Sequence, residues 1–482
     1  MPSFTERYHQ LTKYNPHTID KLGPVLWDSQ PAAFKEVHAE ERVDLLPALR
    51  GLLDAIPEDK AIAMPSPDSL EGLTRLLFFT LGLTARLGQE GAGDVFLRAA
   101  PSAGGLYPTE LYVAVRGIPQ LPDGIYLYHS LRSALYPVWR GDFWGDLRHY
   151  FHGQPAVDAA NILLLFTGVY ARSAWRYKER AYRRILLDTG HALGNALEIC
   201  REMQWDYRLL GGFLDEGLEE LLFLTRGEEF PLLGIAVGPR QSLPPDAGQY
   251  PGPAPQDAVI DLPGGVALQV QQNHCERQRA GQALREPVQL SFPAMAPRDT
   301  GESQLPLILK RRSCREFSGT GIPVDEMRQL LAFALRNEGG EWRLAPGQIE
   351  FHLIVLDVPG LDPGVYALGA ETMRWRLTRA GRFRQEALQI CLGQELAADS
   401  AFLLVYTADM AQLAETYGDR GYRYACMDCG QIGERINLQA IHLGLGSSGI
   451  GGYFDDLVNE LLGLPLSHGV LYITVTGVPA ES

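Results

Sequence analysis

Apolar residues recur at helical or strand spacing along most of the first half of the chain, and this pattern predicts a folded unit. The predicted helices are Asp68–Leu87, Tyr182–Met203 and Glu216–Thr225, and the predicted strands are Leu111–Val115, Ile125–His129, Leu135–Trp139, Ile162–Thr167 and Gly234–Val237. The second and third of these strands are close enough in sequence to form a hairpin. Helices and strands alternate but a hairpin is present, so we expect an α+β fold.

The second half repeats this order of elements from about Leu305 onward. Its predicted helices are Asp325–Arg336, Tyr422–Leu443 and Phe454–Leu462, and its predicted strands are Phe351–Leu356, Val365–Leu368, Arg374–Thr378, Phe402–Tyr406 and Leu471–Thr476. In both halves we therefore expect a mixed or antiparallel central sheet flanked by helices.

The repetition extends to individual residues. The block Tyr177–Arg183 (YKERAYR) returns as Tyr417–Arg423 (YGDRGYR), and Asp455 follows Asp215 by 240 positions. The same offset relates Asp188 to Asp428, Gly190 to Gly430, Gly212 to Gly452, Gln154 to Gln394 and Tyr126 to Tyr366. A period of this length is that of a whole domain, so the sequence predicts two fused copies of one fold. Such a fusion is the single-chain equivalent of a homodimer, in which two copies of a site can diverge.

These patterns divide the chain into four segments. They are an N-terminal arm (1–66), a first domain (67–240), a connecting segment rich in Pro, Gly and Gln (241–300) and a second domain (301–482). The arm carries Trp27 and Phe34 among polar residues and prolines, so we expect it to lie extended on a domain. A structureless stretch as long as the connecting segment fits between two domains better than inside one.

The composition is that of an ordinary globular protein. The 482 residues are 46% apolar and 21% charged. The net charge of −15 argues against nucleic-acid binding, which needs a basic surface. The polar start of the chain and apolar runs as short as Ile162–Phe166 argue against secretion and membrane insertion. We therefore expect a cytoplasmic protein.

Six cysteines in a chain this long do not form a disulfide framework. Cys426 and Cys429 make a C-x-x-C pair, but no second pair or nearby histidine completes a zinc site. Both lie in a predicted helix, where residues three positions apart share a face. Helix packing therefore explains the pair, and no metal is expected.

Three segments have the composition of ligand-binding loops. Pro101–Pro108 (PSAGGLYP) and Gly444–Gly452 (GLGSSGIGG) contain small residues that let the backbone approach a flat ligand, although a plain turn fits the first equally well. Lys310–Phe317 (KRRSCREF) combines four cations with a hydroxyl, which suits a phosphate, and a solvated basic run is the alternative. A dinucleotide-binding fingerprint after a strand and a Walker A sequence are both absent from the sequence.

In this order, within two repeated units, the three segments resemble the FMN-dependent nitroreductase superfamily. RRSCREF (311–317) resembles the family's opening RRSxRxF, which grips the flavin phosphate. GLGSSGIGGYFDD (444–456) resembles the family segment beside the isoalloxazine ring. The resemblance covers nearly the whole chain and implies two nitroreductase-like domains that form an intramolecular pseudodimer.

Further motifs are similar to one branch of this superfamily, the SagB-type or ThcOx-type dehydrogenases. They are PSAGGLYPTELYV (101–113), Tyr8-His9, Thr12-Lys13-Tyr14 and Asp188–His191. That branch includes azoline oxidases, which aromatise thiazoline and oxazoline rings in modified peptides.

The two units carry complementary parts of the family's flavin site. In the family, each flavin lies between the RRSxR arm of one subunit and the PS-loop of the other. Here the first unit has the PS-loop but no RRSxR in Leu53–Ser66, and the second has RRSxR but Trp342–Gly347 in place of the PS-loop. The resemblance therefore implies one composite FMN site and a degenerate second site. The residues expected to hold FMN are Pro101, Ser102, Ala103, Gly104, Gly105 and Leu106 from the first unit and Arg311, Arg312, Ser313, Arg315, Ile450, Gly451 and Gly452 from the second.

Tyr177 and Tyr417 are the candidate catalytic residues, as donors of a hydrogen bond or proton, with a packing role as the alternative. Azoline oxidases of the branch use a Lys-Tyr pair here, whereas this chain has Arg176 before Tyr177 and Thr416 before Tyr417. A guanidinium stays charged at physiological pH and is a poor proton acceptor, which argues against azoline oxidation. His191 could titrate near neutrality, but a structural role is commoner for a helix histidine.

The sequence thus predicts an FMN-dependent oxidoreductase that transfers hydride through flavin N5 to or from a small molecule or a modified peptide. One alternative is an NAD(P)H-dependent reductase of nitro or quinone compounds. Another is a degenerate flavin-binding scaffold that docks a peptide-modification partner. The sequence leaves open whether NAD(P)H donates electrons and whether the pseudodimer is monomeric or dimerises further.

Overall fold

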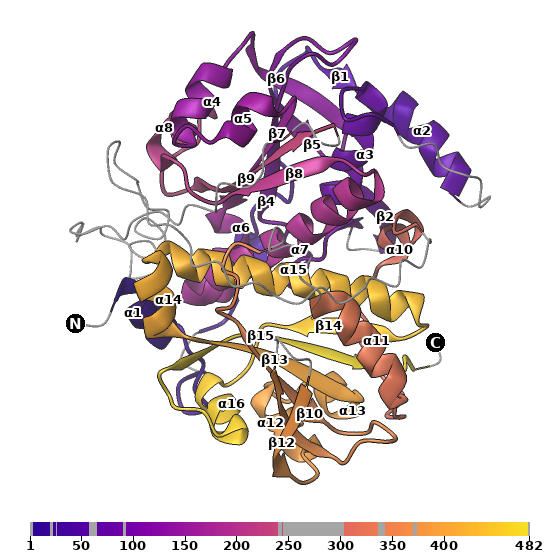
Figure 1. Cartoon of the computed structure of the whole chain (residues 1–482), viewed down its shortest axis with the longest axis vertical. Coiled ribbons are helices and arrows are strands. Elements are labelled where there is room, and N and C mark those ends of the chain that lie inside the picture. The colour runs from indigo at the N-terminus through magenta and orange to yellow at the C-terminus, as the bar shows by residue number, and fades with distance from the viewer. Residues whose placement is uncertain are drawn as a thin grey trace.

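The computed structural model describes residues 3–19, 23–25, 27–56, 65–89, 93–239, 243, 303–335, 343–369 and 374–480. Two units of helices and strands lie one above the other in Figure 1, the first coloured indigo to magenta and the second orange to yellow. Both have an antiparallel sheet flanked by helices, so the predicted α+β class is confirmed. The predicted connecting segment, 241–300, lies outside the described residues except for Leu243.

The elements follow the same order in the two units. The strands are β1 (Val43–Asp44), β2 (Leu83–Gln89), β3 (Gly93–Arg98), β4 (Thr109–Val115), β5 (Gly124–His129), β6 (Ala134–Arg140), β7 (Ile162–Val169), β8 (Asp206–Leu210), β9 (Glu229–Gly238), β10 (Glu350–Val355), β11 (Gly364–Gly369), β12 (Arg374–Ala380), β13 (Phe402–Asp409), β14 (Gly446–Ile450) and β15 (His468–Gly477). The helices are α1 (Phe4–Leu11), α2 (Leu46–Ala55), α3 (Leu70–Leu81), α4 (Trp144–Tyr150), α5 (Pro155–Ala159), α6 (Tyr170–Tyr177), α7 (Ala181–Glu202), α8 (Asp215–Leu221), α10 (Leu305–Lys310), α11 (Val324–Leu335), α12 (Arg384–Ile390), α13 (Glu395–Asp399), α14 (Met410–Tyr417), α15 (Arg420–His442) and α16 (Asp455–Leu462).

The two central sheets have the same strand order. It is β1-β6-β5-β4-β7-β9-β8 in the first unit and β12-β11-β10-β13-β15-β14 in the second, so the first differs only by the added edge strand β1. The registers agree too, because Val113 pairs with Leu164 and Leu353 pairs with Leu404. The repeat offset in the sequence is therefore also the offset between equivalent strand pairs.

The two units meet along α7 and α15, which lie side by side between the sheets (Figure 1). Both helices are buried along almost their full length, because each packs on its own sheet and on the other helix. A Cβ on Gly190 would lie 2.1 Å from the carbonyl oxygen of Met427, and one on Gly430 would lie 2.1 Å from that of Leu187. Glycine is thus required at both positions where the helices touch. One hydrophobic cluster continues across both units.

The N-terminal arm is more structured than the expected extended segment. It contains α1 and α2, and α1 begins with a capping box in which Ser3 and Glu6 each accept a hydrogen bond from the other's backbone N–H. Its two aromatic residues contact the first domain, because Phe34 stacks on His129 and Trp27 packs edge-on against Trp175.

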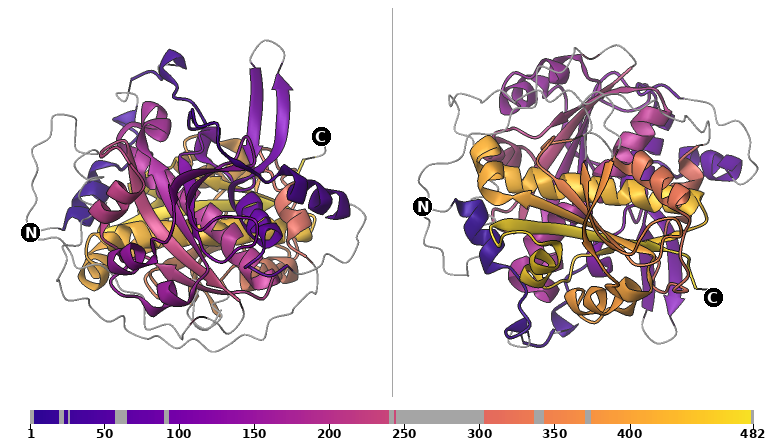
Figure 2. Two further views of the ribbon diagram at one scale, coloured as in Figure 1. Left: turned by 90° about the horizontal axis from the view of Figure 1, so that it is seen from above. Right: turned by 60° about the horizontal axis from the view of Figure 1, so that its bottom comes forward.

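Two of the predictions drawn from the sequence pattern were wrong, one for a helix and one for the glycine-rich segment. The helix predicted over 68–87 ends at Leu81, because Gly82 adopts an extended conformation and the chain continues into β2. The β2–β3 hairpin stands out from the rest of the molecule in Figure 2. The glycine-rich segment expected to be a flexible loop contains β14, which pairs with β15 at the edge of the sheet.

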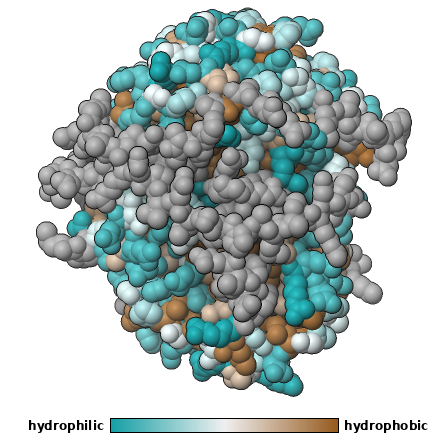
Figure 3. Space-filling model, viewed as in Figure 1, coloured by the Kyte–Doolittle hydropathy of each residue, from teal (hydrophilic) through white to brown (hydrophobic). Residues whose placement is uncertain are grey.

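On the coloured part of the face in Figure 3, hydrophilic and hydrophobic residues are interspersed. Across the described ranges, every helix is too short or too polar to cross a membrane. Cys426 and Cys429 are both buried in the cluster between the units, as helix packing requires.

Candidate functional site

A cavity of about 450 Å³ opens between the two units, within the size range of ligand pockets. We call it the interdomain cavity and define it by the residues that line it. The first unit and the arm contribute Tyr14, Pro101, Ser102, Ala103, Gly104, Arg176, Tyr177, Arg184, Leu187, Asp188 and His191. The second unit contributes Ser313, Arg315, Leu392, Gln394, Asn437, Gly449, Ile450, Gly451, Gly452 and Tyr472. All three segments singled out in the sequence therefore meet at one place.

The basic segment reaches this cavity because it pairs with β14. The backbone N–H of Cys314 donates to Ser447 at 2.9 Å, which places Ser313 and Arg315 beside the glycine-rich segment. Arg311 is buried and points away from the lining: its Nε donates to the carbonyl oxygen of Ala99 at 2.8 Å. Arg312 is exposed and does not line the cavity. Of the four predicted phosphate ligands, Ser313 and Arg315 face the space a ligand would occupy.

The glycines of the second unit leave room for two side chains that form the cavity wall. A Cβ on Gly449 would lie 1.8 Å from the hydroxyl oxygen of Tyr472, and one on Gly451 would lie 1.2 Å from Nη1 of Arg184. Any other residue at Gly449 or Gly451 would displace these groups. The predicted trio Ile450, Gly451 and Gly452 thus lies on the cavity, although we had not predicted the side chains packed against it.

The PS-loop is held by a buried carboxyl group on α7. Asp188 accepts hydrogen bonds from the backbone N–H of Ala103 at 3.0 Å and from the hydroxyl of Ser102. Residues 101–104 line the cavity, whereas Gly105 is exposed and Leu106 is buried elsewhere. Burial raises the pKa of Asp188 to about 6, against the hydrogen bonds from Ser102 and Ala103, which lower it.

Asp428 holds the equivalent loop of the second unit in the same way. It accepts from the backbone N–H groups of Leu344 and Ala345, each at 2.8 Å. Burial raises the pKa of Asp428 to about 7. The paired aspartates of the repeat are therefore loop anchors, present whether or not the loop beside them lines the cavity.

The raised pKa of Asp428 predicts how the free energy of unfolding changes with pH. A carboxyl group with a raised pKa keeps its proton in the folded state where the unfolded chain has lost it, so its contribution to stability falls as the pH rises toward the folded pKa. As the pH rises from 5 to 8, the free energy of unfolding of the wild type should fall by about 2–3 kcal/mol more than that of Asp428→Asn. Urea unfolding of both proteins at several pH values measures this, and parallel profiles would contradict it.

The two candidate catalytic tyrosines have different surroundings. Tyr177 lines the cavity, and its hydroxyl oxygen would lie 2.7 Å from a Cβ on Gly104. Burial raises the pKa of Tyr177, so its hydroxyl stays protonated near neutral pH. Tyr417 does not line this cavity: it is 4% exposed and packs edge-on against Tyr424 in the core. Tyr177 can therefore reach a ligand in the interdomain cavity, and Tyr417 cannot.

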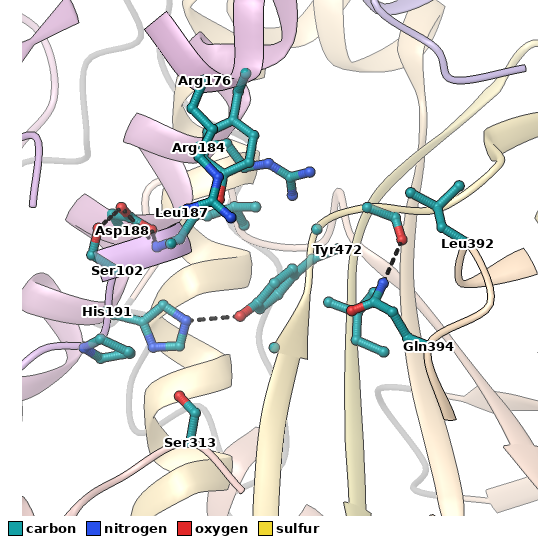
Figure 4. Close-up of a pocket in the computed structure, with 18 of the residues that line it drawn as sticks. Ser102, Arg176, Arg184, Leu187, Asp188, His191, Ser313, Leu392, Gln394 and Tyr472 are labelled. Carbon is teal, nitrogen blue, oxygen red and sulfur yellow. Dashed lines mark hydrogen bonds between the residues drawn. The ribbon is translucent and has the colours of Figure 1, made fainter. Parts of the chain in front are cut away.

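A buried hydrogen-bonded chain enters the cavity from both units, and we had not predicted it. The hydroxyl of Tyr472 lies 2.9 Å from Nε2 of His191, and Nδ1 of His191 lies 2.9 Å from a carboxylate oxygen of Glu434. Figure 4 shows Tyr472 and His191 pointing toward one another from opposite units. Burial raises the pKa of Tyr472, which keeps the proton on its hydroxyl. Both ring nitrogens of His191 thus take part in this series of hydrogen bonds.

The positions that would form a second cavity are filled by side chains. Leu344 stands where the first unit has Gly104, and Tyr424 stands where it has Arg184. A Cβ on Gly211 would lie 2.9 Å from the ring of Tyr424 and 3.2 Å from Leu344. Leu344, Tyr417 and Tyr424 all belong to the main hydrophobic cluster. The degenerate second site stays a prediction, with these equivalent positions occupied by side chains.

Comparisons with known proteins match the chain along most of its length. The model of the nitroreductase family matches twice, at residues 83–239 and 308–478. The crystal structure of a protein from Anabaena variabilis, assigned as a nitroreductase, is 35% identical, and the superposition covers 100% of both chains with a TM-score of 0.87. A protein of Methanocaldococcus jannaschii, also assigned as a nitroreductase, is 29% identical over 180 residues, which are 34% of this chain and 90% of that protein.

The microcin B17-processing protein McbC of Escherichia coli is 25% identical over 141 residues, which are 28% of this chain and 52% of McbC. The matching region thus spans about half the length of that relative. The two family matches confirm the predicted fusion of two nitroreductase-like units. The similarity to McbC agrees with the resemblance to the SagB-type branch.

Proposed function

Because the chain belongs to the nitroreductase family, we propose that it is an FMN-dependent oxidoreductase with one composite flavin site between its two units. The observation that carries this proposal is the interdomain cavity, in which the PS-loop of one unit faces the basic and glycine-rich segments of the other. The crystal structure that superposes on 100% of both chains supports this arrangement of the two units as one that recurs in a relative.

The residues of the cavity fit the chemistry of FMN. Arg315 is exposed and makes no hydrogen bond or ion pair with any described residue, so its guanidinium is available for a phosphate. Ser313 adds a hydroxyl beside it. Gly449 and Gly451 have no side chains of their own, so the Tyr472 hydroxyl and the Arg184 guanidinium pack directly on their backbone and form, with it, the wall that a flat ring would face. Arg311 has a positioning role, because it ties the basic segment to the backbone of Ala99.

Bound FMN supplies reversible hydride transfer at its N5 atom, and the protein supplies binding, orientation and proton control. Tyr472 holds a proton at its hydroxyl oxygen and shares it with Nε2 of His191. Glu434 fixes the His191 ring through Nδ1, so that Nε2 faces Tyr472. We propose that this chain moves protons to and from the cavity, and that Tyr177 donates a hydrogen bond to the substrate.

The basic test is the colour and stoichiometry of the purified protein. We expect about one FMN per chain, because one of the two sites is filled by Leu344 and Tyr424. Two flavins per chain would contradict the composite site, and a colourless protein that takes up no FMN would contradict both the FMN-dependent oxidoreductase and the flavin-binding scaffold. Rapid bleaching of the flavin by NADPH would favour the nitro or quinone reductase alternative.

Arg315→Ala tests the phosphate end separately. Losing one charge-assisted contact of about 1.5–3 kcal/mol should weaken FMN binding by about tenfold or more, measured by flavin fluorescence during dialysis. Arg328→Ala is the matched control, because Arg328 is an exposed arginine whose carboxylate partner is Asp325 on the same helix. Equal FMN affinity of the Arg315 and Arg328 variants would exclude Arg315 as a phosphate ligand.

A further inference from the structure

We infer that the substrate carries an anionic group, such as a carboxylate, and that Arg176 and Arg184 bind it at the end of the interdomain cavity beside Tyr177. This inference rests on the proposed function, since it concerns the substrate of the same site. It adds a substrate class and two binding residues that the family resemblance does not provide.

Arg184 is a buried cation with no partner of its own. It is 5% exposed and lines the cavity from α7. Its Nε atom is buried without a hydrogen-bond partner, and across the described ranges the guanidinium forms neither a hydrogen bond nor an ion pair. It packs against the ring of Tyr177, whose centroid lies 5.1 Å away, and against Gly451, where an added Cβ would lie 1.2 Å from Nη1. A buried guanidinium is costly without an acceptor, so this arrangement fits a site whose anion comes from a ligand.

Arg176 is the second positively charged residue at the end of the interdomain cavity beside Tyr177. Its guanidinium carbon lies 5.5 Å from the centre of the Trp27 ring and 5.7 Å from that of Tyr177. These aromatic rings hold the side chain in place without using its N–H donors. Among the described residues nothing accepts a hydrogen bond from Arg176. Its donors are therefore available beside Gly104, whose added Cβ would lie 3.0 Å from Nη1.

The acidic group nearest to these arginines is already engaged. Asp188 lines the same cavity one helical turn beyond Arg184, but its oxygens accept hydrogen bonds from Ser102 and Ala103. The remaining lining residues that face this end are neutral or cationic. The Ser102 and Ala103 donors are neutral, so this end has two guanidinium charges against one carboxyl group, an excess of positive charge in a protein whose net charge is −15. Such a local excess favours an anionic ligand.

The flavin phosphate does not account for this charge, because the cavity has another cationic end. Figure 4 shows Ser313 on the opposite side of the cavity from Arg176 and Arg184, and Arg315, two positions later in the chain, also lines the cavity. A single flavin has one phosphate. If the basic segment of the second unit holds it, the pair beside Tyr177 remains for a different anion.

A comparison of equivalent positions in the two units distinguishes the arginines that stabilise the fold from those that line the cavity. Arg180 and Arg183 have arginine counterparts in the second unit, Arg420 and Arg423, and all four are buried against carboxylates. The counterparts of Arg176 and Arg184 are Thr416 and Tyr424. The two unpartnered cations thus occur where the cavity exists and are replaced where side chains fill its equivalent. This asymmetry points to a role in binding a ligand.

The test compares two probes of equal shape and different charge, benzoate and benzamide, by calorimetric titration of the FMN-loaded protein. We expect benzoate to bind at least about tenfold more tightly than benzamide, and Arg176→Gln and Arg184→Gln each to remove about a tenfold share of that preference. Benzamide affinity and FMN content should stay unchanged. Arg184→Lys should restore part of the preference, since it keeps the charge and loses the planar fork. Arg50→Gln, which removes an exposed arginine of α2, is the matched control.

Several outcomes would overturn the inference. Wild type that binds both probes equally would exclude an anion site. Equal losses for both probes would show a general effect on the cavity. Loss of FMN from the Arg176 or Arg184 variant, with wild type fully loaded, would assign these arginines to the flavin phosphate. Wild type that takes up no FMN would instead refute the proposed function itself, and this inference with it.

Discussion

Replacing Asp455 with alanine should lower the free energy of unfolding by about 3–5 kcal/mol, the cost of breaking a buried ion pair from one side. Both oxygens of Asp455 are used across the boundary between the units. Nη1 of Arg180 lies 2.7 Å from one, and Nη1 of Arg183 lies 2.8 Å from the other. The three side chains are at most 2% exposed. Without the carboxylate, two guanidinium groups would be left in the core with too few acceptors.

The adjacent residue provides a matched control. Asp456 has a side chain that is 40% exposed and pairs at 2.8 Å with Lys13, whose side chain is 5% exposed and also donates to the carbonyl oxygen of Leu466 at 3.2 Å. Asp456→Ala should therefore cost at most about 1 kcal/mol, as partly exposed ion pairs do. Urea denaturation followed by circular dichroism measures both variants. If Asp455→Ala were as mild as Asp456→Ala, the buried cluster would not hold the units together.

The same cluster occurs a second time, with the units exchanged. Asp215 of the first unit pairs with Arg420 and Arg423 of the second, just as Asp455 pairs with Arg180 and Arg183. In each cluster, two arginines of one unit thus pair with one aspartate of the other unit. Two such clusters with the units exchanged are the arrangement of a two-fold symmetric dimer. The most obvious repeated block of the sequence is explained by this interface.

The arm breaks this symmetry near the cavity. Arg183 donates to the carbonyl oxygen of His9 at 2.6 Å, and Asp455 accepts from the backbone N–H of Tyr14 at 3.0 Å. Tyr14 itself lines the interdomain cavity. The motif near the start of the chain therefore adds to the cluster at Asp455, on the side where the cavity is retained.

The sequence was sufficient to predict the fold, since the long periodic segments 182–203 and 422–443 match α7 and α15 except for one residue beyond each C-terminal end. Short elements were missed for a physical reason. The eight residues of α6 span about two turns, too few for a clear period, although they carry Arg176 and Tyr177. Local pattern is informative where an element is long and is packed on one face.

The site was predictable only in part, because side-chain direction depends on contacts between distant segments. Arg311 matched the family motif, yet its guanidinium turns toward the backbone of the first unit. Tyr472 is one residue in a continuous buried strand, and nothing in that strand distinguishes it from its neighbours. Its role becomes visible when His191 approaches from the other unit at 2.9 Å. Pairs of this kind are separated by hundreds of positions in the sequence.

Replacing Gly104 with leucine should reduce FMN affinity by about a hundredfold, because overpacking a close-fitting site costs about 2–3 kcal/mol. Gly104 has a φ of +66°, which disfavours any side chain. An added Cβ would lie 2.7 Å from the hydroxyl oxygen of Tyr177 and 3.0 Å from Nη1 of Arg176. The larger side chain must therefore displace both groups or occupy the cavity they border.

Gly105→Leu separates this steric effect from backbone strain. Gly105 has a φ of +67°, nearly equal to that of Gly104, but nothing lies within 4 Å of its added Cβ. Both variants should lose similar stability, since the left-handed conformation costs a leucine about 1–2 kcal/mol. That strain is present with and without FMN, so it cancels in the dissociation constant. Fluorescence titration with FMN should then show a large loss for the Gly104 variant alone, and equal losses would place the flavin away from this loop.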